Sequence, residues 1–344
     1  HVGEVGHCLV VGPTGAGKSV LLGLMAMQFR RYRASQIFAF DFGGSIRAAA
    51  LAMGGDWQDL GGSLFGAEGG VALQPLARID EAAERAWAAE WLAALLAGEG
   101  VSIDLAAKEH LWSALCSLAT APRSERTLPG LAVLQPLETA WLVGPSPAAP
   151  VLSYLFHRIE SRLDGSPTLI LIDEGWLVLD SPAFTLQLRA WLKTLRKKNA
   201  SVVFATQSLA DIEGSQIAPA IVESCPTRIF LPNERASEPQ IARIYERFGL
   251  NDRQIEILSR ATPKRDYYCQ SRCGNRLFEL GLGDIALAFA AASSKADQLR
   301  MTEMIEAYGR AHFAQVWLRH RGLDWAADLF PPGEAPIPPE GESA

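Results

Sequence analysis

The stretch that most constrains this fold is VVGPTGAGKSV, at residues 10–20. Its Gly12, Gly17, Lys18 and Ser19 match the spacing G-x-x-x-x-G-K-[ST] of a phosphate-binding loop. A short apolar run precedes the motif and a helical pattern follows it, which is the context that such a loop requires. The sequence therefore predicts an α/β domain that binds nucleotide phosphates through backbone N–H groups.

The positions of this motif have separate expected roles. Lys18 is expected to bridge the β- and γ-phosphates of ATP, and the hydroxyl of Ser19 to bind Mg²⁺. The remaining loop residues are expected to surround the phosphates with amide groups. The predicted nucleotide-binding residues are Gly12, Pro13, Thr14, Gly15, Ala16, Gly17, Lys18, Ser19 and Val20.

A second apolar run, at residues 168–172, ends in Asp173 and Glu174. Because ligands of open α/β sheets bind at the carboxyl ends of strands, Asp173 is expected to hold the Mg²⁺ through a water molecule. Glu174 is expected to be the general base that polarises the attacking water. Gln207 ends the next apolar run and is expected to sense the γ-phosphate.

Apolar runs separated by long helical stretches predict a mostly parallel sheet flanked by helices. The adjacent Asp-Glu pair favours a P-loop NTPase core of the RecA-like kind. Strands are expected at 8–11, 36–41, 168–174, 200–208 and 227–232, with a hairpin over 266–282 that turns at Gly274 and Asn275.

Residues 76–165 differ from their surroundings, because they are rich in Ala, Leu and Trp at helical spacing and have no strand pattern. We interpret them as an all-α insertion in which Trp87, Trp91 and Trp112 anchor the packing. Residues 301–322 predict one amphipathic terminal helix. The expected organisation is a first segment of the core at 1–75, the insertion at 76–165, a second segment of the core with the hairpin and terminal helix at 166–330, and a disordered tail at 331–344.

Composition limits the alternatives. The 344 residues carry a net charge of −6, with 49% hydrophobic and 20% charged residues, as in a globular protein. The chain has no overall excess of basic residues, which weakens the interpretation that it binds nucleic acid. This observation does not exclude that interpretation, since a ring-shaped oligomer can keep its positive charge in its pore. No apolar run approaches the about 20 residues that cross a bilayer, so direct membrane insertion is not expected.

The cysteines and the start of the chain add two smaller expectations. Among the five cysteines, an odd number, only Cys269 and Cys273 are close in sequence, and two thiols make a poor zinc site. We interpret them as ordinary cytosolic thiols. The loop motif follows His1 so closely that we expect an N-terminal region to precede this stretch.

The basic segment WLKTLRKKN, at residues 191–199, raises the question of an arginine finger. Arg196 is a candidate to reach the nucleotide of a neighbouring subunit, and Arg272 and Arg276 beside the hairpin are rivals. Basic residues at a helix end also complement the helix dipole without any catalytic role. The sequence does not choose between these alternatives.

Taken together, these motifs resemble the C-terminal ATPase domain of conjugative type IV secretion ATPases, in the style of TrbE-like conjugal transfer proteins. The resemblance covers about residues 5–330 and includes GPTGAGKS, FAFDFGGS, LILIDEGW and LRKKNASVVFATQS. Its most specific motifs are Asp-Glu-x-Trp at 173–176 and Pro-Lys-Arg-Asp-Tyr-Tyr at 263–268.

The resemblance implies a RecA-like core related to the FtsK–HerA motors and Mg²⁺-dependent ATP hydrolysis that powers pilus assembly and substrate transfer. It implies homo-oligomers up to hexamers, and partners among other type IV secretion ATPases and inner-membrane components. The implied location is the bacterial cytoplasm, peripheral at the inner membrane through partners or an N-terminal region. By position, it assigns nucleotide and Mg²⁺ binding to Lys18 and Ser19, Mg²⁺ and hydrolysis to Asp173 and Glu174, and sensing to Gln207.

Two other functions remain open at this point. A DNA-translocating hexameric motor or coupling protein of the FtsK–HerA type shares the same core, and it would show DNA-stimulated turnover with steep salt dependence. Any DNA binding is expected to be non-specific. A nucleotide-gated scaffold would bind ATP without turnover, and the intact set of Lys18, Asp173 and Glu174 argues against it.

Overall fold

The computed structural model describes residues 6–41, 43–60, 73–98, 100–134, 148–174, 182–215 and 217–331. The predicted tail at 331–344 lies outside the described residues except for its first position, and so does Trp176 of the Asp-Glu-x-Trp motif. The chain divides into two compact units. One comprises His1–Trp57, Leu163–Asp180 and Leu188–Ala344, and the other comprises Gln58–Arg162 and Ser181–Gln187.

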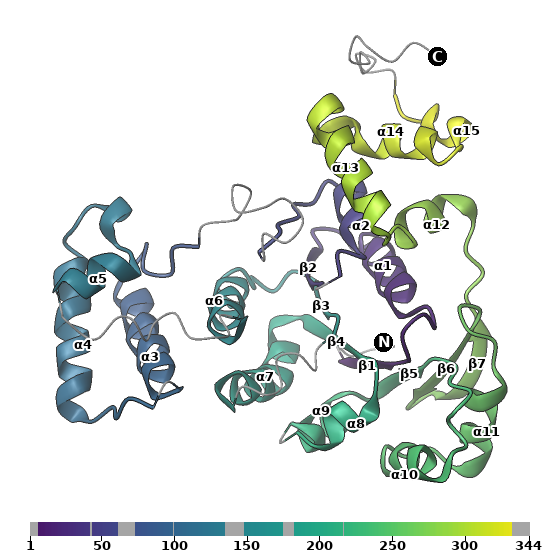
Figure 1. The fold of residues 1–344 in the computed structure, drawn as a ribbon, viewed down its shortest axis with the longest axis horizontal. Coiled ribbons are helices and arrows are strands. Elements are labelled where there is room, and N and C mark those ends of the chain that lie inside the picture. The colour runs from purple at the N-terminus through teal and green to yellow at the C-terminus, as the bar shows by residue number, and fades with distance from the viewer. Residues whose placement is uncertain are drawn as a thin grey trace. The chain divides into compact units, whose positions relative to one another are not determined.

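The first unit is built on a seven-stranded sheet in the order β2-β3-β4-β1-β5-β6-β7 (Figure 1). The first five strands in this order are parallel, whereas β6 runs antiparallel to β5 and β7 antiparallel to β6. The predicted α/β class with a mostly parallel sheet is confirmed. The strands are β1 (Cys8–Val11), β2 (Gln36–Phe40), β3 (Thr168–Ile172), β4 (Ala200–Thr206), β5 (Thr227–Phe230), β6 (Asp266–Ser271) and β7 (Gly274–Glu279).

Helices fill most of the remaining described chain. The first unit holds α1 (Lys18–Phe29), α2 (Arg47–Ala52), α8 (Leu209–Glu213), α9 (Ala218–Ser224), α10 (Pro239–Arg247), α11 (Asp252–Arg260), α12 (Asp284–Ala290), α13 (Lys295–Tyr308), α14 (Phe313–His320) and α15 (Asp324–Ala327). The second unit holds α3 (Ala82–Gly98), α4 (Leu105–Leu118), α5 (Leu128–Leu134) and α6 (Ala148–Glu160), while α7 (Pro182–Thr194) contributes residues to both units. Short 3₁₀ helices span Arg123–Glu125, Leu195–Lys198 and Arg310–His312.

The central strands β1, β3 and β4 are fully buried between layers, as their continuous apolar sequences require. Alternate residues of a strand face opposite sides. On one side, Val10, Leu171 and Val203 share an apolar core with residues of α1, α2, α12, α13 and α14. Figure 1 shows these helices gathered together, with α8, α9 and α10 lying across the sheet from them. The carboxyl ends of the parallel strands therefore lie together along one edge of the sheet.

Two predicted elements differ in detail from the structure. The hairpin exists, but Ser271 pairs with Gly274, so the two-residue turn is Arg272 and Cys273 rather than Gly274 and Asn275. The single terminal helix predicted at 301–322 is wrong, because Gly309 takes a φ of 74° and separates α13 from α14. This break lets both helices contribute to the same core.

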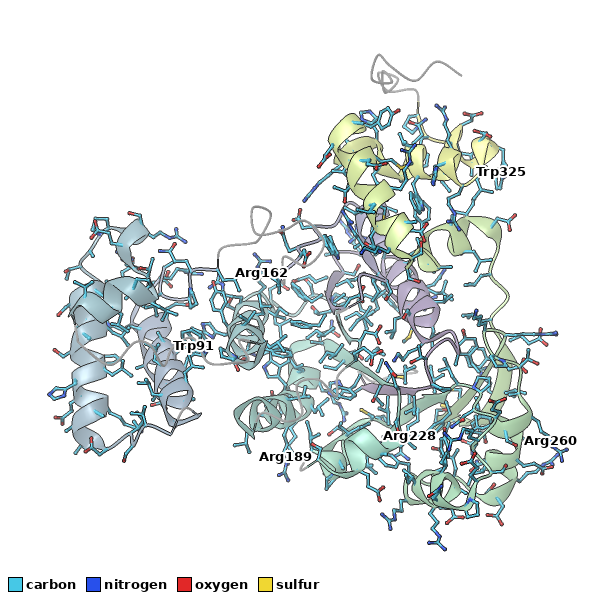
Figure 2. All side chains as sticks on the ribbon, viewed as in Figure 1. Trp91, Arg162, Arg189, Arg228, Arg260 and Trp325 are labelled. Atoms are coloured by element: carbon cyan, nitrogen blue, oxygen red, sulfur yellow. The ribbon has the colours of Figure 1, made fainter. Side chains whose placement is uncertain are left out.

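The described residues of the second unit form helices and no strand. In its core, Trp87 stacks on Trp91 with ring centroids 5.5 Å apart, and Trp91 (labelled in Figure 2) is only 8% exposed. Trp112 is 42% exposed, with the guanidinium of Arg85 5.5 Å from its ring centroid, so its prediction as a packing anchor is wrong. That residues 76–165 form an inserted domain is kept as a proposal.

The helices of the described segments are short or interrupted by polar residues. No helix among them combines the length and the apolar character needed to cross a membrane.

Candidate functional site

The phosphate-binding loop joins the end of β1 to the start of α1. The N–H of Gly12 donates to the carbonyl of Thr206 at 3.2 Å, and a Cβ at Gly12 would lie 2.5 Å from the Cβ of Leu231. Gly15 and Gly17 take φ values of 81° and 106°, which residues with side chains rarely adopt. The shape of this loop therefore requires glycine at all three positions.

The candidate residues meet because they follow neighbouring parallel strands. In the sheet order, β2, β3, β4 and β1 lie side by side. Asp41 follows β2, Asp173 and Glu174 follow β3, Gln207 follows β4, and the loop follows β1. All of these chain segments leave the sheet at its carboxyl edge, where ligands of open α/β folds bind.

Lys18 lies at the centre of a connected cluster and is only 6% exposed. Its Nζ is 2.9 Å from Oε1 of Glu174 and 3.7 Å from Oδ1 of Asp173. The amide nitrogen of Gln207 donates to the same Oε1 of Glu174 at 2.9 Å. The hydroxyl of Thr14 donates to the amide oxygen of Gln207 at 2.8 Å and closes the cluster back to the loop.

Glu174 has an unusual backbone conformation. Its φ is 52°, in the left-handed region, which costs a residue with a side chain about 1 kcal/mol. Its N–H donates to Oδ1 of Asp173 at 3.0 Å. Such conformations gather at functional sites, where the surrounding structure holds them in place.

Ser19 and Asp173 place two side-chain oxygen atoms next to each other beside the phosphate-binding loop. The hydroxyl of Ser19 donates to Oδ2 of Asp173 at 3.4 Å, so two hard oxygen donors lie side by side. Mg²⁺ uses few protein oxygens and keeps several waters, so this pair fits it. Burial raises the pKa of Asp173. The Lys18 cation lowers that pKa, whereas the negative charges of Asp41 and Glu174 raise it further.

Asp41 belongs to this region and was not predicted to have a role. Its carboxylate accepts hydrogen bonds from the N–H of Gly43 at 3.2 Å, the hydroxyl of Ser45 at 3.2 Å and the N–H of Ile46 at 2.6 Å. It is near enough to Asp173 to raise the pKa of that residue. The available signal was its position directly after a strand, the same signal that identified Asp173.

Arg196 does not approach the phosphate-binding loop of its own chain, residues 12–19, which is called the cradle from here on. It belongs to the 3₁₀ helix Leu195–Lys198, which leads into the amino end of β4. Its charge acts on His7, the residue directly before β1, whereas the phosphate-binding loop follows β1 at the opposite end. The catalytic role predicted for Arg196 thus requires the cradle of another subunit.

Arg272 and Arg276 are likewise remote from the cradle of their own chain. Arg272 occupies the hairpin turn, and β6 reaches that turn by running away from the loop edge of the sheet. Arg276 pairs with Cys269 in the middle of β7, and its guanidinium lies 5.9 Å from the ring centroid of Phe278. Neither arginine completes the site within one chain.

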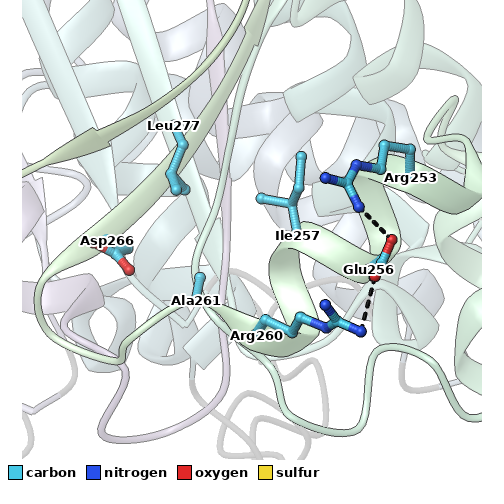
Figure 3. Close-up of a pocket in the computed structure, with 7 residues that line it drawn as sticks. All are labelled: Arg253, Glu256, Ile257, Arg260, Ala261, Asp266 and Leu277. Carbon is cyan, nitrogen blue, oxygen red and sulfur yellow. Dashed lines mark hydrogen bonds and ion pairs between the residues drawn. The ribbon is translucent and has the colours of Figure 1, made fainter.

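A hollow of about 230 Å³ lies between α11 and the hairpin, away from the phosphate-binding loop. Figure 3 shows that two of its arginines, Arg253 and Arg260, point at Glu256, and their nitrogens lie 2.6 Å and 2.9 Å from its carboxylate oxygens. Figure 2 shows Arg260 at the outer side of α11. No residue of the loop lines this hollow, so it is not the nucleotide site.

Comparisons with known proteins show what this chain is similar to. The TraG P-loop domain family matches residues 151–271, which include Asp173, Glu174 and Gln207. A probable conjugal transfer protein TrbE of Sinorhizobium fredii is 44% identical, over 96% of this chain and 55% of that protein. The conjugal transfer protein TrbE of Rhizobium radiobacter is 42% identical, over 96% of this chain and 45% of that protein.

The solved structure of VirB4 from Thermoanaerobacter pseudethanolicus superimposes with a TM-score of 0.60 at 16% identity, covering 81% of this chain and 90% of that one. The type IV secretion system protein virB4 of Bartonella henselae is 26% identical over 92% of this chain and 45% of its own length. The chain thus spans about half the length of the curated relatives it matches. By sequence the chain is similar to TrbE proteins of conjugal transfer, and its fold is that of a P-loop NTPase.

Proposed function

We propose that this chain hydrolyses ATP with Mg²⁺ and that hydrolysis powers a conjugative type IV secretion machine. The observation that carries the proposal is the cluster in which Lys18 and Gln207 both contact Oε1 of Glu174 at 2.9 Å, beside the phosphate-binding loop. The TrbE homologues supply the biological setting.

Binding begins at the loop. Successive N–H groups from Gly15 to Ser19 and the positive end of α1 attract the phosphates. Lys18 exchanges its ion pair with Glu174 for phosphate oxygens, and this exchange releases the carboxylate for a second task. The exchange is inexpensive, because an ammonium in this buried position moves from one anion to another.

Ser19 and Asp173 are proposed to hold the metal between them. Mg²⁺, when bound, neutralises charge that develops on the β- and γ-phosphates. Asp173 is 4% exposed, so its carboxylate stays oriented, and the hydroxyl oxygen of Ser19 beside it would be the second protein group to hold the ion. Asp41 adds negative charge beside this pair, which favours a divalent cation.

Glu174 is proposed to be the general base. Once Lys18 has turned to the phosphates, Oε1 of Glu174 accepts the proton of the attacking water. Gln207 keeps its amide N–H on that carboxylate and its amide oxygen on Thr14, so it links the base to the loop that holds the phosphates. This link gives Gln207 a physical route to sense the γ-phosphate.

A neighbouring subunit is proposed to complete the site. Arginine fingers contribute factors of about 10³–10⁵ to phosphoryl transfer, and none of the three candidate arginines reaches the cradle of its own chain. We propose Arg196, with Arg272 and Arg276 as rivals, as the residue supplied in trans within a homo-oligomer of hexameric type. Work at the cytoplasmic face of the inner membrane with other secretion components is proposed from the homologues.

The decisive measurement is ATP turnover together with nucleotide binding. Glu174→Gln is expected to lower kcat by about 100-fold or more while ATP still binds, because only the base is lost. Lys18→Ala is expected to abolish binding as well as turnover. Turnover that survives both substitutions would show that the assigned site is wrong.

A matched control uses Glu256→Gln, because Glu256 sits in the separate hollow and its ion pairs are exposed. It is expected to leave turnover unchanged. Adding DNA at two salt concentrations separates a secretion ATPase from a DNA motor, since only the motor is expected to show strong, salt-sensitive stimulation.

A further inference from the structure

The turn that leads into β6 contacts the outer side of the phosphate-binding loop at two consecutive carbonyls. The hydroxyl of Tyr267 donates to the carbonyl of Gly17 at 3.2 Å. The backbone N–H of Lys264 donates to the carbonyl of Ala16 at 2.9 Å. Both donors come from a segment about 250 residues after the loop, and neither has a role in the chemistry proposed above.

These two hydrogen bonds bear directly on phosphate binding, because a trans peptide unit points its C=O and N–H in opposite directions. Holding the carbonyl of Gly17 outward directs the N–H of Lys18 inward, toward the phosphates. Holding the carbonyl of Ala16 outward does the same for the N–H of Gly17. Two anion-binding donors are therefore aimed by groups that never touch the ligand.

The contact is close enough to restrict the sequence of the loop. A Cβ at Gly17 would lie 2.6 Å from the hydroxyl oxygen of Tyr267 and 3.2 Å from the Cα of Lys264. The φ of Gly17 is 106°, so any other residue there would also be strained. The turn thus contacts the loop at a position where only glycine fits without strain.

Tyr267 is held firmly in this position. It is fully buried, and its ring stacks on Phe278 of β7 with centroids 5.6 Å apart and planes 23° apart. Burial raises the pKa of its hydroxyl to about 12, so the group remains a neutral donor at every physiological pH. Lys264 has a φ of 65°, and the turn is closed by the N–H of Thr262, which donates to the carboxylate of Asp266 at 2.7 Å.

We propose that Tyr267 is a positioning residue for nucleotide binding, which holds the phosphate-binding loop in its binding arrangement together with the Lys264 amide. The proposal rests on the ATP binding proposed above. A loop that is already ordered loses less freedom when the phosphates bind, so the hydroxyl raises affinity without entering the reaction. The carbonyl of Gly17 also accepts the first helical bond, from Leu21, so the loop weakens rather than collapses when the hydroxyl is lost.

The test is Tyr267→Phe, which removes the hydroxyl and keeps the stacked ring. Loss of one such hydrogen bond is expected to weaken ADP and ATP binding about fivefold. The kcat at saturating ATP is expected to stay within about twofold, because the reacting groups are unchanged. Titration calorimetry with ADP and Mg²⁺, steady-state turnover and thermal unfolding without nucleotide are measured on the same protein.

Tyr268→Phe is the matched control. Tyr268 is the adjacent residue of β6, also buried, and strand alternation places its side chain on the opposite face of the sheet. It is expected to bind nucleotide like the unchanged protein. Equal affinities of Tyr267→Phe and Tyr268→Phe would overturn the proposal, and so would a loss of affinity in Tyr267→Phe matched by lost thermal stability and lost kcat.

A second pair of variants, Gly17→Ala alone and combined with Tyr267→Phe, tests the same contact from the side of the loop. Gly17→Ala should weaken binding strongly, and adding Tyr267→Phe to it should recover some of the affinity, because the 2.6 Å contact with the hydroxyl is removed. No recovery would count against the contact. A different outcome would refute the proposed function itself. In that outcome the unchanged protein does not bind nucleotide, and Lys18→Ala gives the same result in the binding measurement.

Discussion

The amide nitrogen of Gln207 lies 2.9 Å from the carboxylate of Glu174, and this bond joins the ends of two neighbouring strands across the site. Gln207→Ala removes the bond and also frees the hydroxyl of Thr14. We expect kcat to fall about 10-fold or more, with ATP affinity changed less than about threefold, since the loop and Lys18 remain. Steady-state kinetics and nucleotide titration measure the two effects.

Gln28→Ala is the control for that prediction, because Gln28 is an exposed glutamine on α1. It should leave both constants unchanged. If Gln207→Ala instead raised Kd and left kcat alone, Gln207 would be a binding residue and not a sensor.

The position of Arg196 at the amino ends of the strands predicts complementation between two inactive proteins. Arg196→Ala keeps an intact cradle, and Lys18→Ala keeps an intact arginine. Mixed at high concentration, they are expected to recover turnover that neither shows alone, because some interfaces combine both intact elements. The recovery is expected to reach at least about 10-fold over either parent.

The same mixture made with Arg272→Ala or Arg276→Ala decides between the three candidates. Only the true donor of the finger should require complementation. Full activity of Arg196→Ala by itself would remove Arg196 from consideration.

Asp173→Asn is expected to stabilise the nucleotide-free protein while abolishing Mg²⁺-dependent turnover. The folded-state pKa of Asp173 is raised above its ordinary 3.8 by burial and by Asp41 and Glu174, so the ionised carboxylate costs folding free energy. That cost grows as pH rises from 3.8 through the raised pKa, and the asparagine variant avoids it. Thermal unfolding of both proteins between about pH 4 and pH 7 gives the difference.

Asp164→Asn supplies a control of opposite sign, because the N–H of Ser166 lowers the pKa of Asp164 by hydrogen bonding. Its ionised form favours the folded state, so the variant is expected to lose stability near neutral pH. A lower unfolding midpoint for Asp173→Asn at pH 7 would contradict the predicted cost.

His7 predicts a second pH dependence. Its Nδ1 accepts from the N–H of Val202 at 2.9 Å and its Nε2 lies 2.8 Å from the carbonyl of Leu192, an arrangement that requires the neutral ring. Burial lowers its pKa below the ordinary 6.5, and the nearby Arg196 adds to that effect. The unfolded chain then takes up a proton first, so the free energy of unfolding is expected to fall as pH drops below 6.5.

Chemical denaturation at several pH values measures this slope. His7→Gln should flatten it and leave the contribution that comes from His320, whose pKa is also lowered by burial. An unchanged slope in His7→Gln would mean that His7 does not titrate in this way.

Arg47 predicts a stability effect far from the nucleotide. Arg47 is 4% exposed. Its guanidinium donates to the carbonyl of Gln298 at 2.9 Å and to the hydroxyl of Thr302 at 2.9 Å. The guanidinium also lies 4.3 Å from the ring centroid of Trp57. Arg47→Met has a similar volume but removes the guanidinium from both acceptors, and the carbonyl of Gln298 keeps only its bond from the hydroxyl of Thr302 among these side-chain donors. The loss in unfolding free energy is expected to be about 2–3 kcal/mol by urea denaturation.

Arg31→Met is the comparison, because Arg31 is exposed and lies over the ring of Tyr32. Its effect is expected to stay within about 0.5 kcal/mol. Equal effects of the two substitutions would show that burial of Arg47 contributes nothing.

Local pattern was enough to predict the strands and the residues at their carboxyl ends. Burial of a parallel sheet produces continuous apolar runs, and the first polar residue after such a run lies at the ligand edge, as Asp173 does. The same reasoning could have reached Asp41, which follows β2 in the same way. What it lacked was the strand order that brings β2 next to β3.

Contacts that depend on register could not be predicted. Tyr267 and Tyr268 are adjacent and chemically identical, and only the pairing of β6 with β5 decides which of them faces the phosphate-binding loop. The break at Gly309 is of the same kind. The helical spacing of the sequence continues on both sides of Gly309. The packing of α13 and α14 on a shared core selects the turn there.

The glycines of the loop have a further consequence for how such chains diverge. Gly12 is confined by Leu231 and Gly17 by Tyr267, so both are required by the protein's own scaffold whether or not a phosphate is ever bound. A descendant without the proposed hydrolysis would be free to drift at Lys18 and Glu174 but would keep these glycines to preserve the shape of the loop. A surviving glycine pattern therefore indicates only the architecture of the loop, whereas the lysine and the glutamate indicate the proposed hydrolysis.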